Sequence, residues 1–381
     1  MLRKGILWAH KWLGLITGIV VFLVSLSGAI YCFQDDLKLL FYPDRFVLAH
    51  EGEGQTMPLS ELIEIAQKHL PEGEKVSRVD LYPAKDRTWA FRAVGTDPQG
   101  FGLWNYFRYY KRVFLNPYTG EVAAVEDATK EFFQVSLELH MHLLLGKTYG
   151  GPIVTYATAI FVLMLLSGIV LWWPKNTKRK TLKRSFWFSR SAKRKRLNYD
   201  LHNVLGFYSF FVALLLSLTG LVFSFPLFQK AYVKIFNGMA ESEAAQLLPS
   251  DPTYIPQVYP NTLDNTLYFL LEKYPEANMM SIRLRKADSP LVDVQVRMQE
   301  GRTSDFAWYY VEQDTHKIDR IVRSARLSGG DRLGALNYDI HTGSIAGFAS
   351  KLLACLVSLF CASLPVTGTI LWWHKTKGKR R

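Results

Sequence analysis

The hydrophobic positions of this chain gather into four long stretches instead of being spread along its length. Each stretch runs for about the thickness of a bilayer without a charged residue: 12–34, 148–174, 203–229 and 352–373. A helix needs roughly 20 apolar residues to cross the hydrocarbon layer, and these stretches lack the polar face of a soluble core helix. The pattern therefore predicts a mainly α integral membrane protein with a four-helix transmembrane bundle.

Two polar regions, 35–138 and 230–339, have the patterns of small α+β domains. Each begins with an amphipathic helical pattern and continues with strand-like alternation. The helical patterns lie at 58–69 and 262–274, and the clearest strand patterns lie at 87–94 and 291–298. Each region then reaches a strand–turn–strand motif. The first turn, 116–120, contains Pro and Gly, which suit a tight turn; the second, 312–316, has neither, so we expect it to be looser.

Motifs in the first half of the chain return in the second at two similar spacings, which one small gap reconciles, and this indicates a tandem repeat. His10-x3-Gly14 returns 192 positions later as His202-x3-Gly206, and His140 returns 201 positions later as His341. Each half then consists of a helix leading out, an α+β domain and a helix leading in. Two such parallel halves are expected to pack about a pseudo-twofold axis normal to the membrane.

This interpretation divides the chain into seven consecutive segments. They are a first transmembrane helix at 1–34, a first outer domain at 35–138, a histidine-bearing segment with the second helix at 139–174, a basic loop at 175–200, a third helix at 201–229, a second outer domain at 230–339, and a histidine-bearing segment with the fourth helix and a basic tail at 340–381.

The distribution of charge predicts the orientation in the membrane. Three short segments, 1–11, 175–196 and 375–381, carry 19 of the 46 Lys and Arg residues and no acid. Because Lys and Arg concentrate in cytoplasmic loops, both termini and the central loop are expected in the cytoplasm and both α+β domains outside. The formal net charge of +13 is thus explained by topology. The net charge is therefore not evidence for a nucleic acid partner. The basic loop is suited to contact with anionic lipid head groups.

Histidines at the ends of the spans are the candidate functional residues. Repeat symmetry pairs His10 with His202 at the cytoplasmic side, and His140 with His341 at the outer side. Two imidazoles that face each other suit a haem iron, with one ligand on each side. Gly14 and Gly206 each follow a histidine by four residues, on the same helix face, where a glycine leaves room for a flat macrocycle.

Other interpretations of these histidines remain open. Histidines can cap helix ends or bind interfacial water, and zinc or copper would also accept imidazole ligands. His142 and His374 have no repeat partner and are spare ligand candidates, while the histidines of the outer domains, His50, His69 and His316, are expected to be solvated. The cysteines Cys32, Cys355 and Cys361 lie in or beside apolar spans and are expected to be packing residues. Lys11, Arg326 and Arg332 are candidates for pairing with haem propionates, and Tyr338 for an electron exit path.

Several of these motifs together resemble one known family. They are the segments 10–15, 139–146, 200–206 and 340–343, which contain the four paired histidines, and the turn 116–122. The chain resembles the PepSY-associated transmembrane proteins, often called iron-regulated membrane proteins, and among them the ferrisiderophore reductases. The resemblance implies a multi-pass protein of the bacterial inner membrane with two periplasmic PepSY-like domains and two haems b.

The implied activity is the reduction of a ferric siderophore, for example of the hydroxamate type, in the periplasm. The electron donor would be a quinol or a cytoplasmic reductase. Two alternatives stay open at this point: a membrane-anchored PepSY protein that binds or senses a ligand without redox chemistry, and a di-haem quinol dehydrogenase that serves another acceptor. No phosphate-binding glycine loop or dinucleotide fingerprint is present in the sequence, so no flavin or nicotinamide is expected on this chain.

Overall fold

The computed structural model divides the chain into two compact units. It describes residues 1–174, 176, 178–188, 193–238, 251–284, 289–327 and 329–377, so parts of the predicted basic loop and basic tail lie outside the described residues. The helical unit consists of residues 1–33, 136–229 and 340–381, and the sheet unit consists of 34–135 and 230–339. Each unit thus combines segments from both halves of the sequence.

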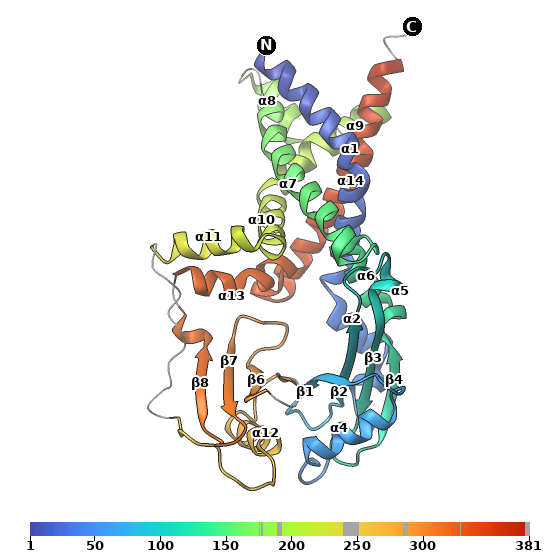
Figure 1. The fold of residues 1–381 in the computed structure, drawn as a ribbon. Helices are drawn as coiled ribbons and strands as arrows, with labels where there is room; N and C mark the ends of the chain where they lie inside the picture. Colours follow the sequence, from blue (N-terminus) through green and yellow to red (C-terminus); the bar gives the residue numbers. More distant parts are fainter. Residues whose placement is uncertain are drawn as a thin grey trace. The chain divides into compact units, whose positions relative to one another are not determined.

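Four long apolar helices build the helical unit. They are α1 (Leu2–Tyr31), α7 (Lys147–Trp172), α10 (Gly206–Ser224) and α14 (Phe348–Lys377). Each is long and apolar enough to cross a membrane, the third as part of a continuous helical stretch from Arg194 to Ser224. Within this bundle α1 and α10 each pack against both α7 and α14 (Figure 1). The four-helix membrane architecture predicted from the hydrophobic stretches is therefore confirmed.

The third span begins with an irregular turn that carries a candidate ligand. Helix α9 (Arg194–Asp200) runs into a π-helical turn, η2 (Leu201–Leu205), before α10 continues it. His202 lies in this π turn. Single π turns inside helices frequently occur at functional sites because they change the direction of the side chains they carry.

The second pair of candidate histidines lies on two separate short helices. His140 is near the end of α6 (Phe132–His142), and His341 is near the end of α13 (Gly329–Thr342). Positive backbone φ angles at Leu143 and Leu144, 53° and 60°, separate α6 from α7. Non-glycine residues rarely adopt this conformation, so the break costs free energy that the surrounding packing must offset.

The sheet unit contains one antiparallel sheet of eight strands in the order β4-β3-β2-β1-β5-β6-β7-β8. The strands are β1 (Val76–Leu81), β2 (Trp89–Thr96), β3 (Phe107–Leu115), β4 (Val122–Asp127), β5 (Met279–Arg283), β6 (Leu291–Arg297), β7 (Phe306–Glu312) and β8 (Ile318–Arg323). The first four come from the first polar region and the last four from the second. Pairing of β1 with β5 joins the two predicted domains into one continuous sheet.

Two helices cover one face of this sheet and form its hydrophobic core. Helices α4 (Leu59–Lys68) and α12 (Thr262–Lys273) lie where the amphipathic patterns predict them. Their apolar sides pack on alternate strand residues, such as Val79 and Ile282, which are fully buried. The two helices are also tied together, because Ser60 donates hydrogen bonds through its N–H and its hydroxyl to Asp264 at 2.9 and 2.6 Å.

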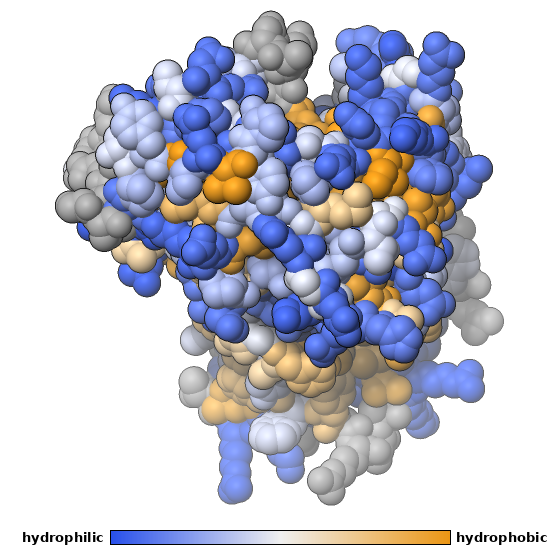
Figure 2. Space-filling model, turned by 90° about the horizontal axis from the view of Figure 1, so that it is seen from below, coloured by the Kyte–Doolittle hydropathy of each residue, from blue (hydrophilic) through white to orange (hydrophobic). Residues whose placement is uncertain are grey.

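Shorter helices complete the described chain. They are α2 (Gln34–Phe41), α3 (Pro43–Phe46), α5 (Leu103–Tyr106), α8 (Arg179–Phe186) and α11 (Pro226–Phe236), with the 3₁₀ turns η1 (Ala128–Lys130), η3 (Ser324–Arg326) and η4 (Ser344–Ala346). The face seen in Figure 2 is mainly hydrophilic, with small separate hydrophobic patches.

The two strand–turn–strand motifs close in the same way, so the prediction of a looser second turn is wrong. In the first turn the N–H of Gly120 donates to Asn116 O at 2.9 Å, and in the second the N–H of His316 donates to Glu312 O at 3.1 Å. Both residues have a positive φ, 73° and 57°. A hydrogen bond of 3.1 Å between His316 Nδ1 and Thr262 Oγ1 helps to hold the histidine in a conformation that favours glycine.

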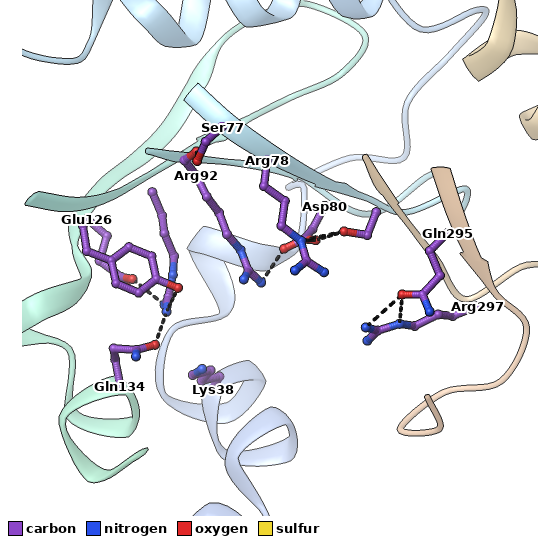
Figure 3. Close-up of polar contacts among 12 residues, drawn as sticks. Lys38, Ser77, Arg78, Asp80, Arg92, Glu126, Gln134, Gln295 and Arg297 are labelled. Atoms are coloured by element: carbon purple, nitrogen blue, oxygen red, sulfur yellow. Dashed lines mark hydrogen bonds and ion pairs between the residues drawn. The ribbon is translucent and has the colours of Figure 1, made fainter. Parts of the chain in front are cut away.

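A buried carboxylate stabilises the other, polar face of the sheet. Asp80 on β1 is 2% exposed and pairs with Arg92 and with Arg78, whose Nε lies 3.2 Å from Asp80 Oδ1 (Figure 3). Burial alone would raise the pKa of Asp80, but the charges of Arg92 and Arg78 lower it overall. The ionised carboxylate therefore stabilises the fold at neutral pH, and this contribution is lost as the pH falls through the lowered pKa.

We therefore expect Asp80→Asn to destabilise the protein at pH 7, by about 2–3 kcal/mol, because two arginines lose their anion. The difference from the unchanged protein should shrink as the medium becomes more acidic. Unfolding followed by tryptophan fluorescence at several pH values measures both effects. Asp319→Asn, at an exposed carboxylate on β8, is the matched control and should change little. A destabilisation that is independent of pH would contradict this account of Asp80.

Candidate functional site

Two pairs of histidines face each other in the helical unit. The imidazole rings of His10 and His202 have centroids 6.5 Å apart, with an angle of 89° between their planes. The rings of His140 and His341 have centroids 6.0 Å apart, with an angle of 59°. The structure thus brings together the same two pairs that repeat symmetry selects in the sequence.

In the His10/His202 pair, each Nδ1 contacts a hydroxyl group. His10 Nδ1 lies 2.9 Å from Ser167 Oγ on α7, and His202 Nδ1 lies 2.9 Å from Thr367 Oγ1 on α14. Both hydroxyls donate their own proton to a helix carbonyl, Ser167 to Met164 O and Thr367 to Ser363 O. The hydroxyl oxygens are therefore acceptors, and we assign the proton of each histidine to Nδ1.

In the His140/His341 pair, backbone carbonyls take the same role. His140 Nδ1 donates to Val24 O on α1 at 2.8 Å, and His341 Nδ1 donates to Leu216 O on α10 at 3.0 Å. Thr219 Oγ1 also lies 3.0 Å from His341 Nδ1. A carbonyl can only accept, so both rings carry their proton on Nδ1 and keep the lone pair of Nε2 for a ligand bond.

The spacing of both pairs fits one metal ion between two imidazoles. Metal–nitrogen bonds of about 2 Å on each side would place the two ring centroids about 6 Å apart. Among the residues that the structure describes, no group of three or more His, Cys, Asp or Glu side chains could hold a metal ion by itself. Each pair could therefore supply two of a metal ion's ligands, and any further ligands would have to come from elsewhere.

Glycines lie beside all four histidine rings, and at three of them an added side chain would crowd the ring. A Cβ added at Gly28 would lie 2.9 Å from His140 Cε1, and one at Gly220 would lie 3.1 Å from His341 Cε1. A Cβ at Gly368 would likewise lie 3.2 Å from His202 Cε1, whereas a Cβ at Gly168 would lie 3.5 Å from His10 Cε1, an ordinary contact distance. The sequence shows these glycines within matching Ser-Gly and Thr-Gly steps of the repeat, but it does not show that they seat the histidines.

The predicted macrocycle positions, Gly14 and Gly206, lie against neighbouring helices. A Cβ at Gly14 would lie 2.8 Å from the flexible end of Met164, and one at Gly206 would lie 3.8 Å from Leu364 Cδ2. Gly14 therefore allows close approach of α1 to α7, whereas a side chain at Gly206 would make only an ordinary contact with α14. Whether a macrocycle also lies over them stays a prediction.

The spare candidates are not members of either pair. His142 is buried, and its Nδ1 lies 2.7 Å from Glu138 Oε2, one turn earlier on α6. His374 lies exposed near the end of α14. Neither position resembles the environment of the four paired rings, so they stay secondary candidates.

Several other predicted residues lie in ordinary environments. Lys11 stacks on the ring of Trp12 at 4.4 Å, and Arg326 and Arg332 are exposed on η3 and α13. Tyr338 lies on α13, three positions before His341. His50 and His69 are exposed, as predicted, whereas His316 is half-buried. The three cysteines, Cys32, Cys355 and Cys361, are free thiols, in agreement with a packing role.

Comparison with known proteins places this site in a family. The chain matches no curated protein sequence. The family described as PepSY-associated TM region matches residues 7–375, a range that includes all four spans, both histidine pairs and the whole sheet unit. A match over nearly the whole length is specific, because it requires the membrane helices and the domains between them in one order. The chain therefore belongs to the PepSY-associated TM family.

Proposed function

We propose that this protein is an inner-membrane electron-transfer protein that holds two haems b and reduces ferric siderophore iron in the periplasm, releasing Fe(II). The observation that carries the proposal is the geometry of the two histidine pairs. Each pair has the spacing of a bis-imidazole metal site, and each ring has its Nδ1 engaged by a fixed partner. A ring that is held in this way keeps one tautomer and one orientation, which metal ligands generally require.

The roles of the residues follow from this arrangement. His10 and His202 would hold one haem, and His140 and His341 would hold the other, each haem through two imidazoles. Bound haem supplies a one-electron Fe(III)/Fe(II) couple, which the protein tunes through its ligands and their surroundings. Two histidine ligands leave no position for oxygen, which favours electron transfer over oxygen chemistry.

The net reaction moves one electron from a donor, a quinol or a cytoplasmic reductase, to one Fe(III) ion in the siderophore. Ferric iron prefers hard oxygen ligands, and Fe(II) binds the same oxygens less tightly. Reduction therefore favours release of the metal from the chelate. The protein contributes binding, position and insulation, and no side chain is consumed.

The duplicated construction supports a path across the membrane. The strand order of the sheet unit repeats the same meander in β1–β4 and β5–β8. In the helical unit, Ser167 and Thr367 occupy equivalent positions in the two halves. Ser167 contacts Nδ1 of His10, and Thr367 contacts Nδ1 of the equivalent His202. This agreement favours two tandem repeats about one pseudo-twofold axis, with one histidine pair near each surface of the bilayer.

The experiment that tests the proposal is the absorption spectrum of the purified protein. We expect a Soret band that sharpens on reduction with dithionite and a content of about two haems per chain. Ferric siderophores should then reoxidise the reduced protein faster than quinones do, which separates this activity from a quinol dehydrogenase with another acceptor. A colourless preparation from cells supplied with iron and haem precursors would overturn the proposal.

A second candidate function rests on a cavity in the sheet unit. The cavity has a volume of about 490 Å³, and Tyr82, Tyr118, Tyr259 and Tyr268 are among the residues that line it. Tyr259 and Tyr268 stack at 4.5 Å. A hollow of this size with aromatic walls suits a small ligand, which favours a ligand-binding or sensing protein if the membrane part carries no cofactor.

The hydroxyl partners of the His10/His202 pair provide a graded prediction. Ser167→Ala and Thr367→Ala should each weaken haem retention at this pair by about 10–100-fold, because each histidine loses the group that fixes its tautomer. Haem loss to apomyoglobin, followed by absorbance, measures the effect. Thr158→Ala is a matched control on α7, since its hydroxyl donates to Val154 O in the same helix. Equal rates of haem loss in all variants would contradict the assigned role.

A further inference from the structure

The polar face of the sheet carries a row of arginines in register. Arg112 on β3 lies directly opposite Arg92 on β2, which lies opposite Arg78 on β1, which lies opposite Arg283 on β5. Like charges in directly opposed positions of a sheet repel each other and destabilise it. Arginines at paired positions of four neighbouring strands therefore indicate that positive charge on this face serves a function.

Anions of the protein itself neutralise one end of this row. Glu126 on β4 lies opposite Arg112 and accepts a hydrogen bond from it at 2.8 Å, and Glu131 lies 3.8 Å from the same guanidinium. In the middle, Asp80 pairs with both Arg78 and Arg92. The positive charges at this end are thus matched by nearby carboxylates.

The other end of the row also carries a carboxylate, because Asp293 on β6 lies opposite Arg283 and is fully buried, but neither Arg283 nor Arg297 forms an ion pair with it. Among the described residues, Arg283 and Arg297 form no ion pair. The guanidinium of Arg283 stacks on Trp308 at 4.8 Å, and Arg297 hydrogen-bonds only the neutral side chain of Gln295, at 3.4 Å. Figure 3 shows Arg78, Arg92 and Arg297 extending from the same face of the sheet. Arg297 thus adds a further positive charge beside the pair that already shares Asp80.

An unused hydrogen-bond donor lies in the same region. Trp308 on β7 lies opposite Gln295 on β6, so both side chains are on the polar face. Its indole Nε1 is buried and has no hydrogen-bond partner among the described residues. A buried donor without an acceptor costs free energy, which a bound oxygen ligand would recover.

We propose that this polar face, between Arg78, Arg92, Arg283, Arg297 and Trp308, binds the free carboxylates of an anionic ferric chelate. The guanidinium group matches a carboxylate in two parallel hydrogen bonds, which gives both strength and orientation. The indole N–H of Trp308 adds a further donor. A positively charged chelate, such as a ferric trihydroxamate with a free amine, would be repelled.

This inference rests on the proposed function and specifies its substrate class. It replaces the hydroxamate expected from family resemblance with a carboxylate-bearing chelate, because the charge of the face decides which chelate can approach. The attraction is electrostatic, so binding should weaken as the salt concentration rises.

The test is calorimetric binding of gallium(III) citrate, a chelate that cannot be reduced, to the purified full-length protein in neutral detergent. We expect binding that Arg297→Gln and Arg283→Gln each weaken by about tenfold or more, since each removes a charged hydrogen-bond donor. Arg297→Lys, which keeps the charge but not the fork of donors, should be intermediate. Lys68→Gln, on α4 at the other face of the sheet, loses one positive charge and should bind like the unchanged protein.

Two outcomes would overturn the inference. One is equal affinity of Arg297→Gln and Lys68→Gln for gallium citrate, with both variants folded by their unfolding temperatures. The other is displacement of the chelate by phosphatidylglycerol vesicles at low lipid concentration, which would assign the face to lipid phosphates. Because gallium accepts no electron, binding succeeds or fails independently of haem. If the protein bound gallium citrate but did not reduce ferric citrate, the anion site would be supported and the proposed reductase activity would be contradicted.

Discussion

His10→Ala and His202→Ala are each expected to remove the same one of two haems from the purified protein, and His140→Ala and His341→Ala to remove the other. In every case the haem content should fall by about half, because a haem that keeps only one of its two histidines is held far less tightly. Haem per chain, measured as the pyridine complex, gives the content. The double variant His10→Ala/His202→Ala should lose no more than either single variant, whereas His10→Ala/His341→Ala should lose both haems.

The remaining histidines near the spans provide the controls. His374→Ala changes an exposed ring, and His142→Ala changes a ring that is paired with Glu138. Both should keep the full haem content. If His142→Ala lost one haem while His140→Ala kept both, the ligand assignment on α6 would be wrong. If all variants kept the same content, neither histidine pair would hold a haem.

The membrane architecture could be predicted from the sequence because its physical rule is simple. A stretch such as 148–174 has no charged residue, and only a helix satisfies its backbone in lipid. The facing histidines were predictable for a different reason. A duplicated sequence places His10 and His202 at equivalent positions, and a twofold axis brings equivalent residues together. Neither argument requires knowledge of packing details.

The contacts that orient the histidine rings could not be predicted in the same way. That Val24 offers its carbonyl to His140 depends on how α1 packs beside α6, and local sequence carries no sign of it. Ser167 and Gly168 look like ordinary small residues of a membrane helix until the ring of His10 is placed against them. The separation of α6 from α7 depends on Leu143 and Leu144 in left-handed conformations, which propensity argues against.

The continuous sheet was also beyond the reach of sequence patterns. Alternation predicts that a run such as 291–297 is a strand, but it does not identify the neighbouring strand. The pairing of β1 with β5 joins residues about two hundred positions apart, and it extends the row of arginines from the first half of the sheet into the second. The position of Arg78 opposite Arg283 is therefore a property of the fold that no local window contains.

The largest kinetic effect is expected when the two histidine pairs are broken separately. His341→Ala should still be reduced by a quinol at the remaining His10/His202 site, but its reoxidation by a ferric chelate should slow by more than an order of magnitude. His10→Ala should show the reverse, with slow reduction by the quinol and rapid reoxidation after chemical reduction with dithionite. The reason is that each pair would serve one surface of the membrane, so each variant loses only one of the two half-reactions.

Stopped-flow absorbance in the Soret region measures both half-reactions on the same preparation. Gly5→Ala, at a position on α1 with open space around it, is a suitable control and should leave both rates unchanged. If His10→Ala and His341→Ala slowed the same half-reaction, the two pairs would not act in sequence. A path across the bilayer would then be excluded even if both haems were present, since electrons would enter and leave the protein through a single site.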